Sequence, residues 1–221
     1  MISEAAACRW QPDRLRLLLL LDACEAADLA PVPVLRLHAL AFLSNVLSPI
    51  WSVESYDGKI LKRRGGPFYP ELQKQLDRLV GLGLVAVHDV RYVEEEGKLR
   101  IEAKFSLMSG MADTIISDAQ LFMDERSVSE FFRRLAFSIS RIREPLEDLV
   151  KFDATWSDAR TGVGDVIDFA EWRRANYSVF AARVFENLSA KGATIGRGDK
   201  LHLYMRFLER KWPGAAVRIT R

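Results

Sequence analysis

The sequence has little of the residue types that build disulfide and metal sites. Of its 221 residues only two are cysteine, Cys8 and Cys24, and three are histidine, at positions 38, 88 and 202. Two cysteines provide neither a disulfide framework nor a zinc knuckle, and no HExxH or CxxC pattern is present. The sequence therefore predicts buried thiols in the reducing cytoplasm and no metal centre.

Patterns for nucleotide binding and acyl transfer are also missing. The segment 192–200 is rich in glycine but lacks the Gly-Lys-Ser/Thr ending of a P-loop, and no serine lies in a Gly-x-Ser-x-Gly elbow. We therefore expect no cofactor, no small-molecule substrate and no enzymatic activity in this chain.

Long apolar runs and a strong net charge are absent as well. Leu17–Leu21 is the longest purely aliphatic run, and a bilayer-spanning helix needs about 20 apolar residues. The formal net charge is +2, so no global field draws the chain to nucleic acid and any basic contact must be local. These features predict a cytoplasmic protein without a membrane segment.

The first half of the chain has a recognisable order of predicted elements. Apolar residues recur at helical spacing over 12–29, 35–47 and 70–82. Two alternating, β-prone runs at 84–93 and 99–107 then meet at an acidic, glycine-containing turn, which is typical of a hairpin. Helix, helix and β-ribbon is the order of a winged-helix domain, which we predict for residues 1–107 with its core at 31–107.

The second half, residues 108–221, is predicted to be a helical region. Ser127 and Glu130 form a capping box, and an apolar seam at heptad spacing follows at Val128, Phe132, Leu135, Ile139, Ile142, Leu146 and Leu149. Pro145 predicts a break near 141–144. Whether the seam packs within this chain or against another one stays open.

Two further helices are predicted, at 166–189 and, with Asp199 as its N-cap, at 200–212. The second also alternates like a strand, which would pair with 215–220 and make this region a second winged-helix-like domain; this alternative stays open. The fold class is therefore α+β, mostly α with a small β-hairpin.

A basic loop is the best candidate for a binding site. Residues 50–68 read as a loop in which Lys59, Lys62, Arg63 and Arg64 place four positive charges within six residues, before Gly65 and Gly66. Lysines would bind phosphate as point charges and arginines as forks. Partner protein and nucleic acid are equally compatible with this loop, and non-specific DNA contact stays open.

Two observations bear on other functions. Glu71 and Asp77 lie on the outer face of the predicted 70–82 helix, where negative charge opposes phosphate and argues against sequence-specific DNA reading. Asp89, Glu102 and Lys104 on the hairpin match the acidic and Glu-x-Lys residues with which restriction-type nucleases hold Mg²⁺. The same pattern is also what a solvated strand face looks like.

Three runs in the first half resemble a known family. His38–Pro49, Asp57–Gln73 and Leu76–Gly83 are similar to middle components of bacterial ABC-three-component defence operons, the Lamassu-like anti-phage systems. The resemblance implies a non-enzymatic adaptor that bridges an SMC/Rad50-like ATPase and an effector, often a nuclease, in a hetero-oligomer. These components are similar in turn to the winged-helix accessory subunits of bacterial condensins. The family of middle components has no established ligand motif, so no site residues carry over to this sequence.

The leading hypothesis is therefore a winged-helix adaptor in a DNA-associated complex. The alternatives are a winged-helix transcription regulator that binds operator DNA directly, and a metal-dependent nuclease that uses Asp89, Glu102 and Lys104.

Overall fold

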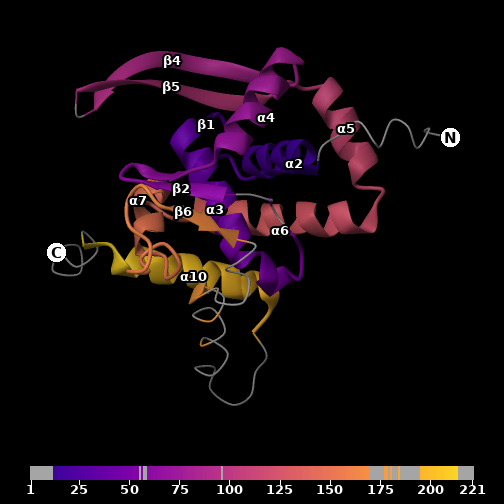
Figure 1. Ribbon diagram of the computed structural model, residues 1–221. Helices are drawn as coiled ribbons and strands as arrows, with labels where there is room; N and C mark the ends of the chain where they lie inside the picture. The colour runs from indigo at the N-terminus through magenta and orange to yellow at the C-terminus, as the bar shows by residue number, and fades with distance from the viewer. Residues whose placement is uncertain are drawn as a thin grey trace.

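The computed structural model describes residues 12–54, 56, 59–95, 97–169, 177, 178, 180, 184 and 195–213. Its helices and two small antiparallel sheets make an α+β fold, as predicted (Figure 1). The α-helices are α2 (Pro12–Ala26), α3 (Val34–Trp51), α4 (Pro70–Gly81), α5 (Met111–Ala119), α6 (Met123–Ser140), α7 (Leu146–Leu149) and α10 (Arg197–Lys211). The strands are β1 (Val32–Pro33), β2 (Lys59–Arg63), β3 (Gly66–Phe68), β4 (Val85–Glu95), β5 (Lys98–Leu107) and β6 (Val166–Asp168).

The first sheet has the strand order β1-β5-β4. The two-residue strand β1 pairs with the second strand of the hairpin, at Val32 with Phe105. The predicted helices at 12–29, 35–47 and 70–82 and the predicted hairpin are all confirmed as elements. Along the chain the order is α2, β1, α3, α4 and then the β4–β5 hairpin, with β2 and β3 inserted before α4.

Helix α3 lies at the centre of the core. By length and composition alone it could cross a membrane, but 72% of it is buried inside the molecule. Its polar side chains find partners there: Asn45 donates to the Tyr69 hydroxyl at 2.9 Å and accepts the Tyr56 N–H at 2.7 Å. The helix runs past the predicted stop at Ser48-Pro49 to Trp51, and Ser52, with φ 59°, caps its C-terminal end.

The basic segment is not a loop, contrary to the sequence prediction. Strands β2 and β3 form a hairpin, and β6 pairs with the other edge of β2, so the second sheet has the order β3-β2-β6. Ile60 and Lys62 share one face of β2, and both are buried. The prediction failed because the apolar signal of this five-residue strand is only Ile60 and Leu61.

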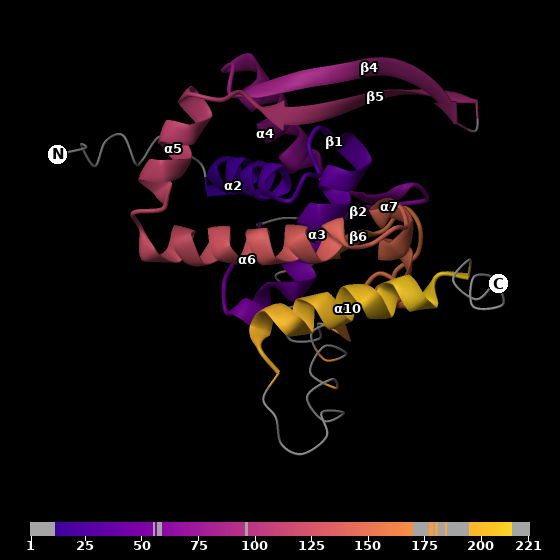
Figure 2. The same cartoon turned by 180° about the vertical axis from the view of Figure 1, so that it is seen from behind.

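The predicted heptad seam packs within this chain. Val128, Phe132, Leu135 and Ile139 are buried on α6, which lies along α2 (Figure 2). The chain breaks after Ser140, as predicted, and Leu146 and Leu149 belong to the separate helix α7. The predicted start at Ser127 is wrong, because α6 begins at Met123, one turn earlier.

The C-terminal half differs from the prediction in two further places. Residues 166–168 form β6 instead of opening a helix, and most of the predicted 166–189 helix lies outside the described residues. Residues 197–211 are the helix α10, which confirms the predicted helix at 200–212, and the strand alternative for this segment is wrong. The N-cap of α10 is Gly196, whereas the predicted N-cap, Asp199, lies within the first turn. The predicted second wing at 215–220 lies outside the described residues.

One hydrophobic core joins the two halves of the chain. The buried cluster extends from Leu17 on α2 to Leu208 on α10, and it includes Phe131 and Phe132 from α6. The predicted domain boundary at residue 107 stays a prediction, but it passes through this continuous core.

Candidate functional site

The β4–β5 hairpin projects from the helices as a long, twisted ribbon (Figure 1). The register between its strands shifts between His88 and Arg91. Asp89 at this bulge has φ 51°, a left-handed conformation that short polar side chains tolerate. Gly97, with φ 74°, closes the turn. A bulge bends a strand and increases its twist, so it changes the direction of the distal half of the ribbon.

The distal half carries an apolar stripe. Tyr92 and Ile101 are cross-strand neighbours, and Leu99 lies two residues from Ile101 on the same face. Their exposed fractions are 73% for Tyr92, 58% for Ile101 and 76% for Leu99. Nearer the body the same strands bury Val85, Phe105 and Leu107. The alternation in the sequence predicted a half-buried strand but did not indicate that its outer apolar residues meet no core.

The charged side chains on the other face of the ribbon form ion pairs with one another. Glu102 accepts hydrogen bonds from Arg91 at 2.8 Å and from Arg100 at 2.6 Å, and Lys104 lies 2.7 Å from Asp89. A Cβ placed on Gly65 would lie 3.6 Å from the Arg100 guanidinium, so this face approaches the β2–β3 turn. The charged side chains line a hollow of about 540 Å³ between the ribbon, β1 and α7.

Asp89, Glu102 and Lys104 are engaged in ion pairs within the ribbon. The hydrogen bond from Lys104 lowers the pKa of Asp89, and the hydrogen bond from Arg91 lowers the pKa of Glu102. Both carboxylates are thus satisfied by separate cations. Among the described residues no group of three acidic, histidine or cysteine side chains is placed to hold one ion.

The four basic residues of the predicted site have different surroundings. Lys59 is exposed and lies 3.7 Å from Asp168, and the Arg63 guanidinium lies over the Phe68 ring at 3.7 Å. Arg64 is exposed at the β2–β3 turn. Lys62 is only 8% exposed, so the predicted cluster of four surface charges is reduced to three.

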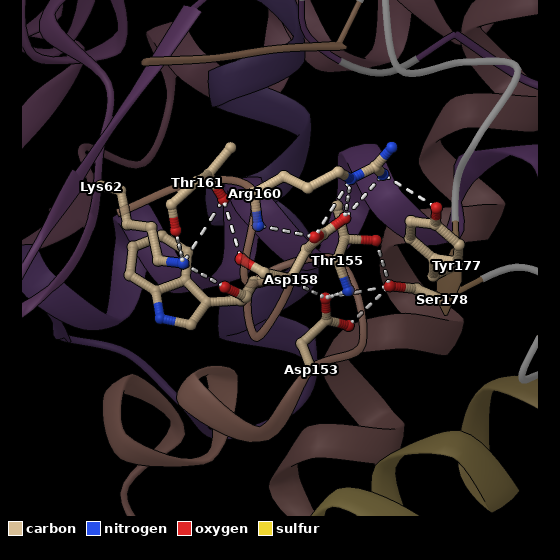
Figure 3. A network of polar contacts seen from close by, with 9 residues as sticks. Lys62, Asp153, Thr155, Asp158, Arg160, Thr161, Tyr177 and Ser178 are labelled. Carbon is tan, nitrogen blue, oxygen red and sulfur yellow. Dashed lines mark hydrogen bonds and ion pairs between the residues drawn. The ribbon is translucent and has the colours of Figure 1, made fainter. Parts of the chain in front are cut away.

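Lys62 binds the chain that folds over it. Its ammonium donates to the Trp156 carbonyl at 2.5 Å and to the Thr161 carbonyl at 2.7 Å (Figure 3). The Trp156 ring lies 5.3 Å from the same nitrogen. Burial lowers the pKa of Lys62, although Asp158 and Asp165 oppose that effect. This lysine therefore holds the 156–161 segment in place and does not reach a partner.

A second buried polar group lies beside it. The Asp153 carboxylate is fully buried and accepts hydrogen bonds from Ser178 and from the Thr155 N–H at 2.8 Å (Figure 3). It also accepts a hydrogen bond from the Tyr204 hydroxyl at 2.6 Å. Burial raises the pKa of Asp153 despite these donors. With its lone pairs occupied and no exposure, this carboxylate ties α10 to the chain after α7 and is not placed for catalysis.

Other groups with potential chemistry are also structural. The buried His38 ring accepts the Tyr69 N–H and pairs with Gln73, both at 3.3 Å. Burial raises the pKa of the Cys24 thiol to about 12, which removes it as a nucleophile. His88 pairs with Ser106 at 2.8 Å. Cys8 lies outside the described residues.

The outer face of α4 pairs much of its charge within the helix. Lys74 lies 3.1 Å from Glu71, and Gln73 donates to Asp77 at 2.9 Å. Exposed carboxylates repel the phosphates of DNA, so this face of α4 is poorly suited to enter a DNA groove.

Comparison of the chain with protein-family models, with curated proteins and with solved structures gives no match.

Proposed function

We propose that this protein is a non-enzymatic adaptor that joins an SMC/Rad50-like ATPase to an effector, such as a nuclease, in a cytoplasmic bacterial anti-phage defence complex. The single observation that carries the proposal is the outward apolar stripe of Tyr92, Leu99 and Ile101. The identity of the two partners rests on the resemblance of residues 31–107 to Lamassu-like middle components.

The distribution of polarity on the ribbon supports docking. A solvent-exposed hairpin ordinarily places polar side chains outward, yet here the ion pairs of Glu102 and Asp89 line the hollow toward the body. Exposed apolar patches with a polar rim mark interaction sites. Tyrosine at the centre of such a patch is a frequent hot spot, because it buries a large rigid area.

The edges of the ribbon offer a second mode of contact. Strand β4 is the outer strand in the order β1-β5-β4, and β1 covers β5 only at Phe105 and Lys104. In the described residues the outer edge of β4 therefore has unpaired backbone groups, and such an edge can accept a strand from a partner. An extended partner segment would add backbone hydrogen bonds to the apolar contact.

The arrangement of elements supports a winged-helix assignment for residues 31–107. A short strand between the first two helices pairs with the second strand of a hairpin that follows the third helix. In this assignment the β4–β5 ribbon is the wing and β2–β3 is an insertion before α4. The wing, and not the basic segment first considered, is then the contact surface.

Paired serine substitutions test the proposal. Tyr92→Ser with Ile101→Ser removes two of the three stripe side chains without touching the core, because both are more than half exposed. We expect recovery of the coiled-coil ATPase to fall at least about tenfold, since loss of a hot-spot side chain costs about 2 kcal/mol or more. The measurement is pull-down of the tagged chain from cells that express its neighbouring genes.

The matched control is Met111→Ser with Leu121→Ser, which removes two exposed apolar side chains at the start of α5 and just after it, outside the stripe. This variant should recover the ATPase like the unchanged protein. Equal recovery by the ribbon variant, or no coiled-coil ATPase with the unchanged protein, would refute the proposal.

A further inference from the structure

A basic hollow with aromatic walls lies at the opposite end of α6 from α5. It has a volume of about 500 Å³ and lies between the end of α3, the C-terminal half of α6 and the start of α10. The lining residues that matter are Trp51, Arg134, Phe137, Arg141, Arg197 and Asp199. None of these lining residues belongs to the ribbon or to the Lys62 network.

The arginines of this hollow are not engaged with acids. Arg134, Arg141 and Arg197 form no ion pair with any other residue that the structure describes, whereas Arg133, next in the chain to Arg134, lies 3.0 Å from Asp22. Asp199 is the one carboxylate among the described lining residues. Three guanidinium groups facing one carboxylate give the hollow a local positive charge that the net charge of the chain conceals.

Two aromatic rings accompany these charges. Phe137 is 53% exposed, and the Arg141 guanidinium lies 5.4 Å from its ring centre. Trp51 is fixed by Phe131, with ring centres 6.1 Å apart, and the Arg197 guanidinium lies 6.0 Å from the indole. The hollow therefore offers flat apolar surfaces directly beside the cations.

This combination selects a nucleotide unit over other anions. Guanidinium forks pair with phosphate oxygens, and bases stack on aromatic rings for about 1–3 kcal/mol each in proteins that bind single strands. A volume of about 500 Å³ is suited to a ligand of nucleotide size. An acidic peptide would pair with the arginines but would bring no flat ring to Phe137.

We infer that this hollow binds single-stranded nucleic acid, with phosphates on Arg134, Arg141 and Arg197 and a base stacked on Phe137. The inference does not depend on the ribbon's partner. The groups are on a different surface, and the two tests use different variants and different ligands, so either proposal can fail while the other stands.

The test measures fluorescence anisotropy of a labelled oligothymidylate of about 12 nucleotides at about 50 mM salt. We expect Arg134→Gln with Arg141→Gln to weaken binding at least about tenfold. The slope of log K against log salt should become shallower by about 1.4, since each lost phosphate contact contributes about 0.7 on a single strand. Phe137→Ala should weaken binding about fivefold or more, because it removes the stacking surface.

Arg126→Gln is the matched control, because Arg126 is an exposed arginine near the other end of α6. It removes one charge and should leave affinity and slope unchanged. Circular dichroism and the melting temperature of every variant should match those of the unchanged protein, since all substituted side chains are exposed.

Competition distinguishes the sources of the ligand. Unlabelled oligothymidylate should displace the probe, whereas free adenosine monophosphate and an oligoglutamate peptide at equal concentrations should not. The inference is overturned if the unchanged protein does not bind the probe. It is also overturned if the Arg134→Gln/Arg141→Gln and Phe137→Ala variants bind the probe as tightly as Arg126→Gln does. Equal displacement by the mononucleotide would reassign the hollow to a free nucleotide, and equal displacement by the peptide would reassign it to an acidic protein.

Discussion

At the scale of single residues, Lys62 shows how neighbouring charges in a sequence reach different environments. Along β2 the side chains of Lys59 and Arg63 lie on the exposed face. The side chain of Lys62 lies on the opposite, buried face, together with Ile60. Its ammonium satisfies two carbonyls that lie far along the chain, at Trp156 and Thr161. A basic run gives no sign of this difference until the strand and its direction are known.

Lys62→Met tests this role. Methionine keeps the aliphatic stem but leaves both carbonyls without their charged donor, so we expect the free energy of unfolding to fall by about 2 kcal/mol. Chemical denaturation followed by circular dichroism gives the value.

Arg63→Met is the control, because Arg63 is exposed and its guanidinium lies over the Phe68 ring. It should change the free energy of unfolding by less than about 0.5 kcal/mol. Equal losses for the two variants would show that the Lys62 contacts carry no stability.

At the scale of elements, the sequence predicted the type of most helices and strands better than their ends or surroundings. The heptad spacing from Val128 to Ile139 identified α6, but Ser127 suggested a start that the structure places at Met123. The alternation in β5 likewise identified the strand but not which apolar residues reach the core. Periodicity fixes which side chains share a face, whereas burial depends on what packs against that face.

Neighbouring positions on α6 test whether its seam is internal to this chain. Leu135 is fully buried, and Phe137 is 53% exposed. Leu135→Ala should lower the free energy of unfolding by about 2–5 kcal/mol, and Phe137→Ala should change it by less than about 0.5 kcal/mol. Denaturation should give the same values at low and high protein concentration; a concentration-dependent midpoint would place the seam between chains.

At the scale of the whole molecule, the core is shared by elements that are distant in the chain. Strand β6 completes the sheet begun by β2, and α6 covers α2, so stability belongs to both halves together. The sequence did not predict this joining, because no local pattern shows that residues 59–63 and 166–168 pair. The basic and aromatic hollow was missed for the same reason, since its side chains come from three separate helices.

The pH dependence of global unfolding should report the buried His38. Burial lowers the pKa of His38 from 6.5 to about 4, so the unfolded chain binds the proton more readily. Its contribution to stability is complete above pH 6.5 and falls as the pH drops toward 4, by on the order of 3 kcal/mol in total. The raised pKa of Asp153 acts in the opposite sense, because its protonation favours the folded state.

A difference measurement isolates the histidine. The free energy of unfolding of the unchanged protein minus that of His38→Asn should shrink between pH 6.5 and about pH 4. Asparagine can still accept the Tyr69 N–H but does not titrate, and all other groups cancel. A difference that is constant over this range would contradict the assignment.

The bond between Lys62 and Thr161 spans 99 residues of chain, and this separation has a consequence for synthesis in the cell. At about 5–20 residues per second, a ribosome needs roughly 5–20 s to make the intervening stretch. During that interval the nascent β2 has neither its β6 neighbour nor the carbonyls that receive its ammonium, and the leucines of α2 lack their cover from α6. This early surface therefore stays uncovered until synthesis has reached the segments that pack on it.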